Sequence, residues 1–148
     1  MSDVASAEEN ARLAEEFIEK VFNQHDVGYL KDVLSEDFVD LSPAPGESGD
    51  KASAIAWFER SFQSMPDMHA EVIQTIASGD KVAIRGRYTG TDEGGFMPGM
   101  EPTHKKISME SIDIVQIGPD GKHISHFGIQ DVMNAMGQLG LLPPPPEG

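Results

Sequence analysis

The feature that most constrains the fold is a pair of alternating segments near the C-terminal end of the chain. Residues 106–117 and 122–131 each alternate between apolar and polar side chains, and a Gly-Pro-Asp-Gly sequence at 118–121 separates them. Turn residues between two β-rich runs are typical of a hairpin. The sequence therefore predicts an antiparallel sheet that includes this hairpin.

Polar residues interrupt the apolar face of this hairpin. Because side chains alternate along a strand, Asp113 and Met109 share one face of the first strand. His126, Gln130 and Ile124 share one face of the second. Polar groups on an apolar face are costly to bury without a partner or a use. We expect the three polar side chains to enter one pocket with Met109 and Ile124 as its apolar wall, unless a β-bulge reverses the alternation.

Helical patterns precede the sheet. Asp50 is expected to cap the third helix, and Pro66 to end it. Helices that cluster before antiparallel strands indicate an α+β fold, with the helices packed on one face of a curved sheet. The interior of such a cone is the default ligand site. The expected helices cover residues 7–23, 27–34, 51–65 and 132–139, and the expected strands cover 37–41, 68–78, 81–91, 105–117 and 122–131.

Composition fits one domain of 148 residues, with a flexible lead at 1–7 and a proline-rich tail at 143–148. The chain has no cysteine, which excludes disulfides and thiolate nucleophiles. A net charge of −14 disfavours nucleic acid and anionic lipid as partners. The sequence shows no membrane-spanning apolar run and no signal-peptide pattern, so we expect a cytoplasmic protein.

Several short stretches carry a family resemblance. They are residues 87–91, 95–103, 112–114, 120–122 and 138–143. Together they resemble the SnoaL-like polyketide cyclase or ester cyclase group of the nuclear-transport-factor-2-like (NTF2-like) superfamily, over about residues 11–143. The resemblance implies a cone in which a curved mixed or antiparallel sheet wraps over three N-terminal helices and encloses a pocket. It also implies a homodimer or homotetramer.

The resemblance further implies acid/base chemistry on a hydrophobic, polyketide-like molecule with a carbonyl group. The reaction would be an intramolecular aldol cyclisation or an isomerisation, without a metal or organic cofactor. A carboxylate in an apolar cavity has a raised pKa and can act as a base near neutral pH. An isomerase of a related fold works in this way and provides the analogy.

One family motif differs in this chain. Members of the family commonly have His-Trp-Asp on the last strand, where this chain has His126-Phe127-Gly128. Glycine therefore occupies the aspartate position, and Asp113 could supply a carboxylate from across the sheet. The catalytic candidates are Asp113, His126 and Asp131. The candidates for substrate binding are Trp57, Phe38, Phe62, Tyr88, Phe96, Met97, Met109 and Gln130.

Each candidate also has a structural interpretation. Asp113 could be a buried carboxylate paired with Arg85 or Arg87, and His126 could be a core histidine. Asp131 could cap the last helix. The aromatic candidates could belong to the core, and the loop at 92–103 could act as a lid. Arg85 and Arg87 could otherwise lie on a solvated or inter-subunit face.

Several other chemistries have no signature in the sequence. No metal-ligand spacing, serine-hydrolase elbow or phosphate-binding glycine loop is evident. One remaining hypothesis is an enzyme in which Asp113 abstracts a proton beside a carbonyl while His126 and Gln130 donate to the enolate oxygen. The other is a non-catalytic protein that binds a small hydrophobic ligand, and Gly128 favours it.

Overall fold

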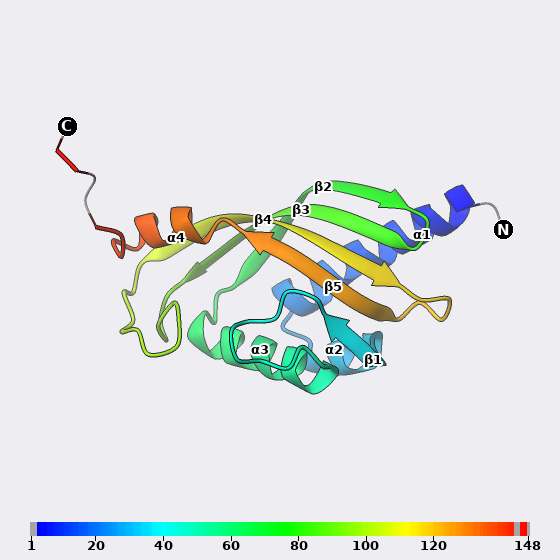
Figure 1. The fold of residues 1–148 in the computed structure, drawn as a ribbon, viewed down its shortest axis with the longest axis horizontal. Helices are drawn as coiled ribbons and strands as arrows, with labels where there is room; N and C mark the ends of the chain where they lie inside the picture. Colours follow the sequence, from blue (N-terminus) through cyan, green and yellow to red (C-terminus); the bar gives the residue numbers. More distant parts are fainter. Residues whose placement is uncertain (1–2, 144–145, 148) are drawn as a thin grey trace.

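The alternating strands and clustered helices fold as an α+β cone, which confirms the predicted architecture (Figure 1). The computed structural model describes residues 3–143 and 146–147. The elements are α1 (Asp3–Phe17), the π-helix η1 (Ile18–Asn23), α2 (Val27–Val33), β1 (Leu34–Asp40), α3 (Lys51–Ser64), β2 (His69–Ser78), β3 (Lys81–Thr91), β4 (Lys106–Ile117), β5 (His123–Gln130) and α4 (Val132–Gln138).

The two ends differ from the expected boundaries. Helix α1 begins at Asp3 and so overlaps the lead that was expected to be flexible. The remaining predictions for the lead and the tail concern residues 1–2, 144–145 and 148, which lie outside the described residues.

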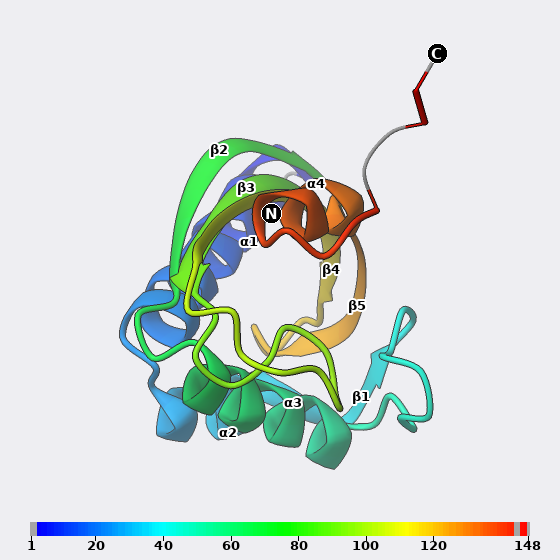
Figure 2. The same ribbon diagram turned by 90° about the vertical axis from the view of Figure 1, so that its left-hand side faces the viewer.

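The sheet is mixed and strongly curved. In the part of the chain that the structure describes, its strands lie in the order β1-β5-β4-β3-β2. Strand β1 runs parallel to β5, whereas the other neighbours are antiparallel. Seen along the cone, β2 to β5 arch over α2 and α3 (Figure 2). This arrangement brings the end of β1 beside the middle of β5, although the two are far apart in the sequence.

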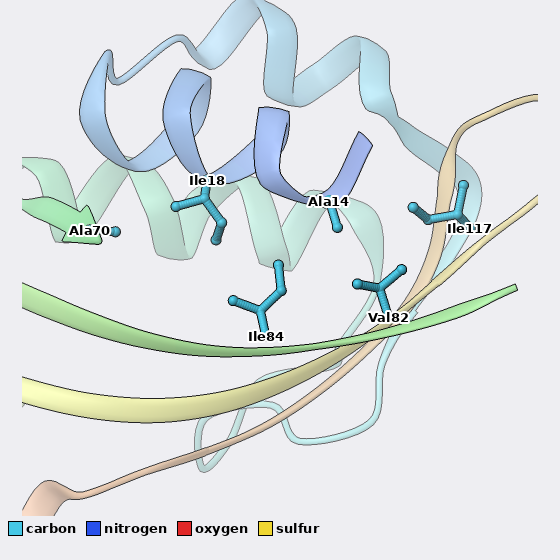
Figure 3. Packing of buried hydrophobic residues seen from close by; sticks show 6 residues of the cluster. All are labelled: Ala14, Ile18, Ala70, Val82, Ile84 and Ile117. Atoms are coloured by element: carbon cyan, nitrogen blue, oxygen red, sulfur yellow. The ribbon is translucent and has the colours of Figure 1, made fainter. Parts of the chain in front are cut away.

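Helix α1 packs on the concave face of the sheet. Ala14 and Ile18, four residues apart, share one side of the helix and face Val82 and Ile84 of β3 (Figure 3). A single helix over 7–23 was expected, but its last turns widen into the π-helix η1. Asn23 at the end of η1 exchanges two hydrogen bonds with the backbone of Ala70, at 2.7 and 3.1 Å, and so fixes the helix end to β2.

Capping residues set the start of the later helices as expected. The Asp50 carboxylate accepts a hydrogen bond of 2.9 Å from the backbone N–H of Ser53, and α3 ends at Ser64, before Pro66. Under the cone, α2, η1 and β1 share a second apolar cluster with α3 packed against it. Its buried members are Val21, Leu30, Leu34 and Phe38.

The predicted hairpins form at glycine-containing turns. Gly79 joins β2 to β3 with a φ of 59°, and Gly121 joins β4 to β5 with a φ of 80°. The pairing of β4 with β5 shifts register between Gln116 and Ile117, which marks a bulge. Because of this bulge, the β5 residues that precede Ser125 do not continue the regular alternation of side chains between the inside and the outside of the cone.

Helix α4 closes the other end of the sheet over β4. Ile107 and Met109 of β4 pack with Ala135 and Leu139 in a third apolar cluster. The loop at 92–103 is held together by Asp92, a fully buried carboxylate. It accepts hydrogen bonds from the backbone of Gly95 and from the backbone and hydroxyl of Thr103, at 2.8–2.9 Å.

Candidate active site

A cavity of about 360 Å³ lies between the concave face of the sheet and the helices α1, η1 and α3. Most of its wall is apolar. The apolar wall consists of Ala14, Phe17, Ile18, Phe22, Leu34, Phe38, Ala44, Pro45, Ala54, Trp57, Phe58, Ile84, Val115 and Val132. Within it, Asp40, Asp113 and His126 form a connected polar group. An apolar cavity with a few convergent polar groups is the usual form of a small-molecule site.

His126 lies between two carboxylates. Its Nδ1 is 3.0 Å from Asp40 Oδ1, and its Nε2 is 2.8 Å from Asp113 Oδ1. The sheet order explains the contact, because β5 lies between β1 and β4. In register, Asp40 lies opposite His126, and Asp113 lies opposite Gly128. We call Asp40, His126 and Asp113 the relay.

Two further hydroxyl groups fix the Asp113 carboxylate. The Ser111 hydroxyl donates to Asp113 Oδ2 at 2.6 Å, and the Tyr88 hydroxyl donates to the same oxygen at 3.2 Å. Together with His126, these groups engage both carboxylate oxygens, and only 16% of the side chain is exposed. The carboxylate is therefore held in one orientation at the cavity wall.

Gly128 makes room for this carboxylate. A Cβ atom at position 128 would lie 2.3 Å from Asp113 Oδ1 and 3.0 Å from His126 Nε2. Real Cβ contacts are essentially never as short as the first of these, so a side chain here would displace the Asp113 carboxylate. The glycine in the His-Phe-Gly sequence is thus the cross-strand partner that Asp113 requires in this position.

Asp40 is held from the other side. Its Oδ1 accepts hydrogen bonds from the backbone N–H and the hydroxyl of Ser42, at 3.0 and 3.3 Å. The Ser42 hydroxyl oxygen also accepts a hydrogen bond of 2.9 Å from the backbone of Gly128. These bonds tie the segment after β1 to β5 and place Asp40 next to His126.

The relay determines the charge of its histidine. Burial lowers the pKa of His126, but its hydrogen bonds and charge interactions with Asp113 and Asp40 outweigh this effect and raise the pKa to about 9. At neutral pH the ring is therefore an imidazolium that donates to both carboxylates. Burial raises the pKa of Asp40, but the hydrogen bonds from His126 and Ser42 outweigh it and hold this pKa below its ordinary value.

Tyr88 keeps its proton at the relay. Burial raises the pKa of its phenol, and the negative charge of Asp113 raises it further. The phenol therefore keeps the proton that it donates to the Asp113 carboxylate.

Several predicted site residues meet in the cavity. Asp113 and His126 are bonded to each other within the relay. The other predicted residues that line the cavity are Trp57, Phe38, Tyr88 and Gln130.

Other predicted site residues lie elsewhere. Phe62 stacks on His25 with ring centroids 4.2 Å apart, outside the cavity lining. Phe96 and Met109 belong to the apolar cluster under α4, and Met97 is exposed. No residue of the 92–103 loop is among the residues that line the cavity.

Asp131 lies at the start of α4, outside the cavity lining. Its carboxylate accepts a hydrogen bond of 3.2 Å from the backbone N–H of Asn134 and so caps this helix. This position matches the structural interpretation of Asp131.

One structural alternative for Asp113 is wrong. Arg85 and Arg87 do not contact it, because odd-numbered residues of β3 point to the convex face of the sheet. There Arg85 pairs with Glu110 at 2.8 Å, and Arg87 approaches Glu71 at 3.6 Å. The expected apolar wall also changes, since the bulge in β5 brings His123 rather than Ile124 into the cavity lining.

Asp40, Ser42 and His123 also belong to the site but were not predicted from the sequence. A signal for Asp40 was present, because Phe38 lies two residues earlier and therefore on the same face of the strand. Phe38 was expected in the pocket, so Asp40 could have been placed there with it. Nothing local in the sequence indicates that β1 pairs with β5.

The described residues contain neither a candidate metal site nor a helix that could span a membrane. Within residues 3–143 and 146–147, no group of three or more His, Cys, Asp or Glu side chains is arranged to hold a metal ion. None of the helices described there is long and apolar enough to cross a membrane.

The sequence of the chain matches the model of a known protein family. Residues 12–139 match the model of the SnoaL-like polyketide cyclases. The chain belongs to this family. The family membership supports a cyclase-type role for the SnoaL-like chain, as the resemblance implied. No sequence among the curated proteins matches it.

Solved structures share the NTF2-like fold of the SnoaL-like chain. AclR of Streptomyces galilaeus, named as a candidate hydroxylase, is 27% identical with a TM-score of 0.82, and the match covers 96% of this chain and 91% of AclR. IdmH of Streptomyces antibioticus, named as a candidate polyketide cyclase, is 27% identical with a TM-score of 0.76, over 88% and 98% of the two chains. TsrD of Streptomyces laurentii is 25% identical with a TM-score of 0.79, over 96% and 100%.

Proposed function

We propose that the SnoaL-like chain is an acid/base enzyme that cyclises or isomerises a hydrophobic, polyketide-like molecule with a carbonyl group. The observation that carries this proposal is the relay inside an apolar cavity, where Asp113 is bonded to His126 at 2.8 Å. Family membership and the relationship to IdmH support the cyclase-type role. Because one fold hosts many reactions, the site rather than the fold has to carry the specific reaction.

In the proposed reaction, Asp113 removes a proton from the carbon beside a carbonyl group. The electrons of the broken C–H bond form an enolate, and the proton moves to the Asp113 carboxylate. For an aldol closure, the enolate carbon forms a bond to a second carbonyl carbon of the same molecule, the π electrons of that carbonyl move to its oxygen, and the resulting alkoxide takes the proton back from Asp113. For an isomerisation, the proton returns to another carbon. No oxidant or reductant is needed for either outcome.

His126 has a positioning role in this proposal. Both of its nitrogens are engaged by carboxylates, so it is not free to donate to an enolate oxygen as the sequence suggested. Its ring donates a hydrogen bond to Asp113 Oδ1 and so orients this carboxylate, and Asp40 on the far side holds the ring in place. We assign the donor for the enolate oxygen to Gln130, which lines the same cavity, because the hydroxyl proton of Tyr88 is already donated to Asp113 Oδ2.

A binding protein without catalytic activity is the second candidate. The observation that favours it is the complete hydrogen bonding of the relay, in which both nitrogens of His126 and both oxygens of Asp113 already have partners. A fully satisfied polar network can serve as a rigid wall for a ligand. The two candidates differ in whether the ligand leaves the cavity chemically changed.

Turnover of aromatic polyketide esters with α-deuterated ketone groups separates the two. Mass spectrometry would follow ring closure and loss of deuterium. We expect Asp113→Asn to reduce turnover by about 100-fold or more, because the amide cannot accept the proton. Glu110→Gln is the matched control, because this residue lies on the same strand but pairs with Arg85 on the convex face. Equal turnover in Asp113→Asn and wild type would overturn the proposed role, and unreacted ligand retained in native mass spectra would support the binding protein.

A further inference from the structure

His123 is a cavity residue that the relay does not use. It lies at the start of β5, lines the cavity and is only 2% exposed. Its Nε2 is buried and has no hydrogen-bond partner among the described residues. Among the residues that the structure describes, no other side-chain nitrogen or oxygen is buried without a partner. An orphaned polar atom of this kind requires an explanation.

The surroundings of His123 favour an apolar side chain. Its ring lies 4.8 Å from the ring of Phe17, measured between centroids, and the residue pairs with Leu34 of β1 and Ile117 of β4. A leucine or phenylalanine could fill this place without leaving a polar atom unpaired. A buried nitrogen without a partner lowers the stability of the fold, so packing alone does not explain a histidine at this position.

The charge state of His123 restricts what it can bind. Burial, together with the nearby positive charge of His126, lowers its pKa to about 4. At neutral pH the ring is uncharged and offers one N–H donor and one nitrogen acceptor. The relay, with one imidazolium and two carboxylates, carries a formal charge of −1 and disfavours an anionic ligand group in the same cavity. A hydroxyl or carbonyl oxygen without charge suits His123 best.

We infer that His123 is a second polar anchor of the cavity, which binds an uncharged hydroxyl or carbonyl oxygen at the end of the substrate remote from the reacting carbon. The bulge places His123 opposite Ile117 and His126 opposite Val115, two positions apart along β4, so the two anchors are separated by roughly 7 Å at about 3.3 Å per residue. The apolar body of the substrate would lie between them against Phe17 and Phe58. This inference rests on the proposed function in one respect, that the cavity is the substrate site.

The experiment uses two probes of similar shape, 2-naphthol and 2-methylnaphthalene, with the full chain. Affinities would be measured by fluorescence quenching or calorimetry for wild type, His123→Phe and His123→Leu. We expect the preference of wild type for the hydroxyl probe to fall about tenfold in both variants, which corresponds to about 1.4 kcal/mol. Binding of 2-methylnaphthalene should remain or improve.

Asp113→Asn provides the comparison that locates the hydroxyl group. If the hydroxyl is bound by His123, this variant keeps the preference for 2-naphthol even though it loses turnover. A preference that falls in Asp113→Asn and persists in His123→Phe would overturn the inference, because the hydroxyl would then bind at the relay. Failure of wild type to bind 2-naphthol, or equal preference in all variants, would overturn it too.

A measurement on wild type covers the case in which the variants fold poorly. Nitrogen-15 NMR of the imidazole groups reports protonation and hydrogen bonding at each ring nitrogen. We expect the resonances of a neutral His123 to shift when 2-naphthol is added and to stay unchanged with 2-methylnaphthalene. Unchanged resonances with both probes would overturn the inference, because the ring would then have another partner. Because these readouts concern binding alone, their failure is distinguishable from a failure of the proposed reaction.

Discussion

The two faces of the β4–β5 pair contrast strongly. The concave face carries Asp113 and His126, which are partly buried and hydrogen-bonded at 2.8 Å. The convex face of the same strands carries large apolar side chains that are exposed. They are Ile112, Ile114, Phe127 and Ile129, with Ile129 66% exposed.

At these positions the sheet departs from an ordinary two-sided sheet, in which apolar side chains face inwards and polar ones outwards. The concave face keeps charged groups at the wall of an apolar cavity, where each of them has a partner. The convex face exposes an apolar patch beside a strip of paired charges formed by Arg85, Arg87, Glu71 and Glu110. Patches of this kind mark interaction sites. The inner face therefore holds the candidate site, and we propose that the outer face is a surface for self-association.

The largest effect should come from Gly128→Ala, which tests whether the inner face depends on a missing side chain. The new Cβ would meet Asp113 Oδ1 at 2.3 Å and displace the carboxylate from His126. We expect turnover of the ester substrates to fall about 100-fold or more, with circular dichroism showing a folded chain. Gly137→Ala is the matched control, because its Cβ would make ordinary contact with Leu142 at 3.6 Å. Full activity of Gly128→Ala would show that the relay geometry is dispensable.

The second effect concerns the pH dependence of the relay. In the folded chain the pKa of His126 is raised from 6.5 to about 9. Its contribution to stability is therefore complete below about pH 6.5 and is lost as the pH rises through 9, on the order of 3 kcal/mol in the free energy of unfolding. Proton NMR of the His126 ring would give the pKa directly. Urea unfolding of wild type and His126→Gln between pH 6 and 10 would give the energy difference, and a ring that titrates near 6.5 would contradict the relay charges.

A third, smaller effect should appear on the outer face. We expect a second copy of the chain to cover the convex patch, because its charged strip carries both signs and can complement itself. Ile129→Lys should weaken self-association about tenfold, or about 1.4 kcal/mol, since it places a charge in the apolar patch. Sedimentation over a concentration series would measure this change. Met133→Lys is the control, because Met133 is also highly exposed, at 73%, but belongs to α4 rather than to the convex face of these strands. A wild-type chain that stays monomeric at high concentration would contradict this expectation.

The smallest effect should be that of Asp131→Ala, which tests where the inner site ends. Asp131 caps α4 through Asn134 and lies outside the cavity lining. Loss of the cap should lower the free energy of unfolding by about 1 kcal/mol, as measured by urea titration. Turnover per folded molecule should change little. A large loss of turnover, with stability unaffected, would instead support the catalytic role considered from the sequence.

Much of the fold was predictable from local pattern. The caps at Asp50 and Asp131, the end of α3 before Pro66 and the turns at Gly79 and Gly121 all depend on short-range chemistry. The inward direction of Asp113 followed from its alternation with Met109 along one regular strand. Substrate-site predictions such as Phe96 and Met109 failed to reach the cavity because the cone is filled at that end by α4.

The site needed information that no local pattern contains. His126 meets Asp40 only because β1 pairs with β5 in parallel, across 86 residues of sequence. His123 enters the cavity only because a bulge changes the alternation near Ile124. The pattern of the hairpin indicated Asp113, His126 and Gln130, but not Asp40 as the partner of His126 or His123 as the second anchor.

The sequence by itself determined the elements, the inner face of β4 and the absence of a side chain at position 128. These properties follow from the period of each element and from the covalent identity of each residue. The tertiary structure alone decided that Gly128 leaves space for Asp113, that Asp40 completes the relay and that His123 faces the cavity. The physical reason is that strand pairing and register are set by long-range packing, and one inserted residue in a strand reverses which side chains are buried.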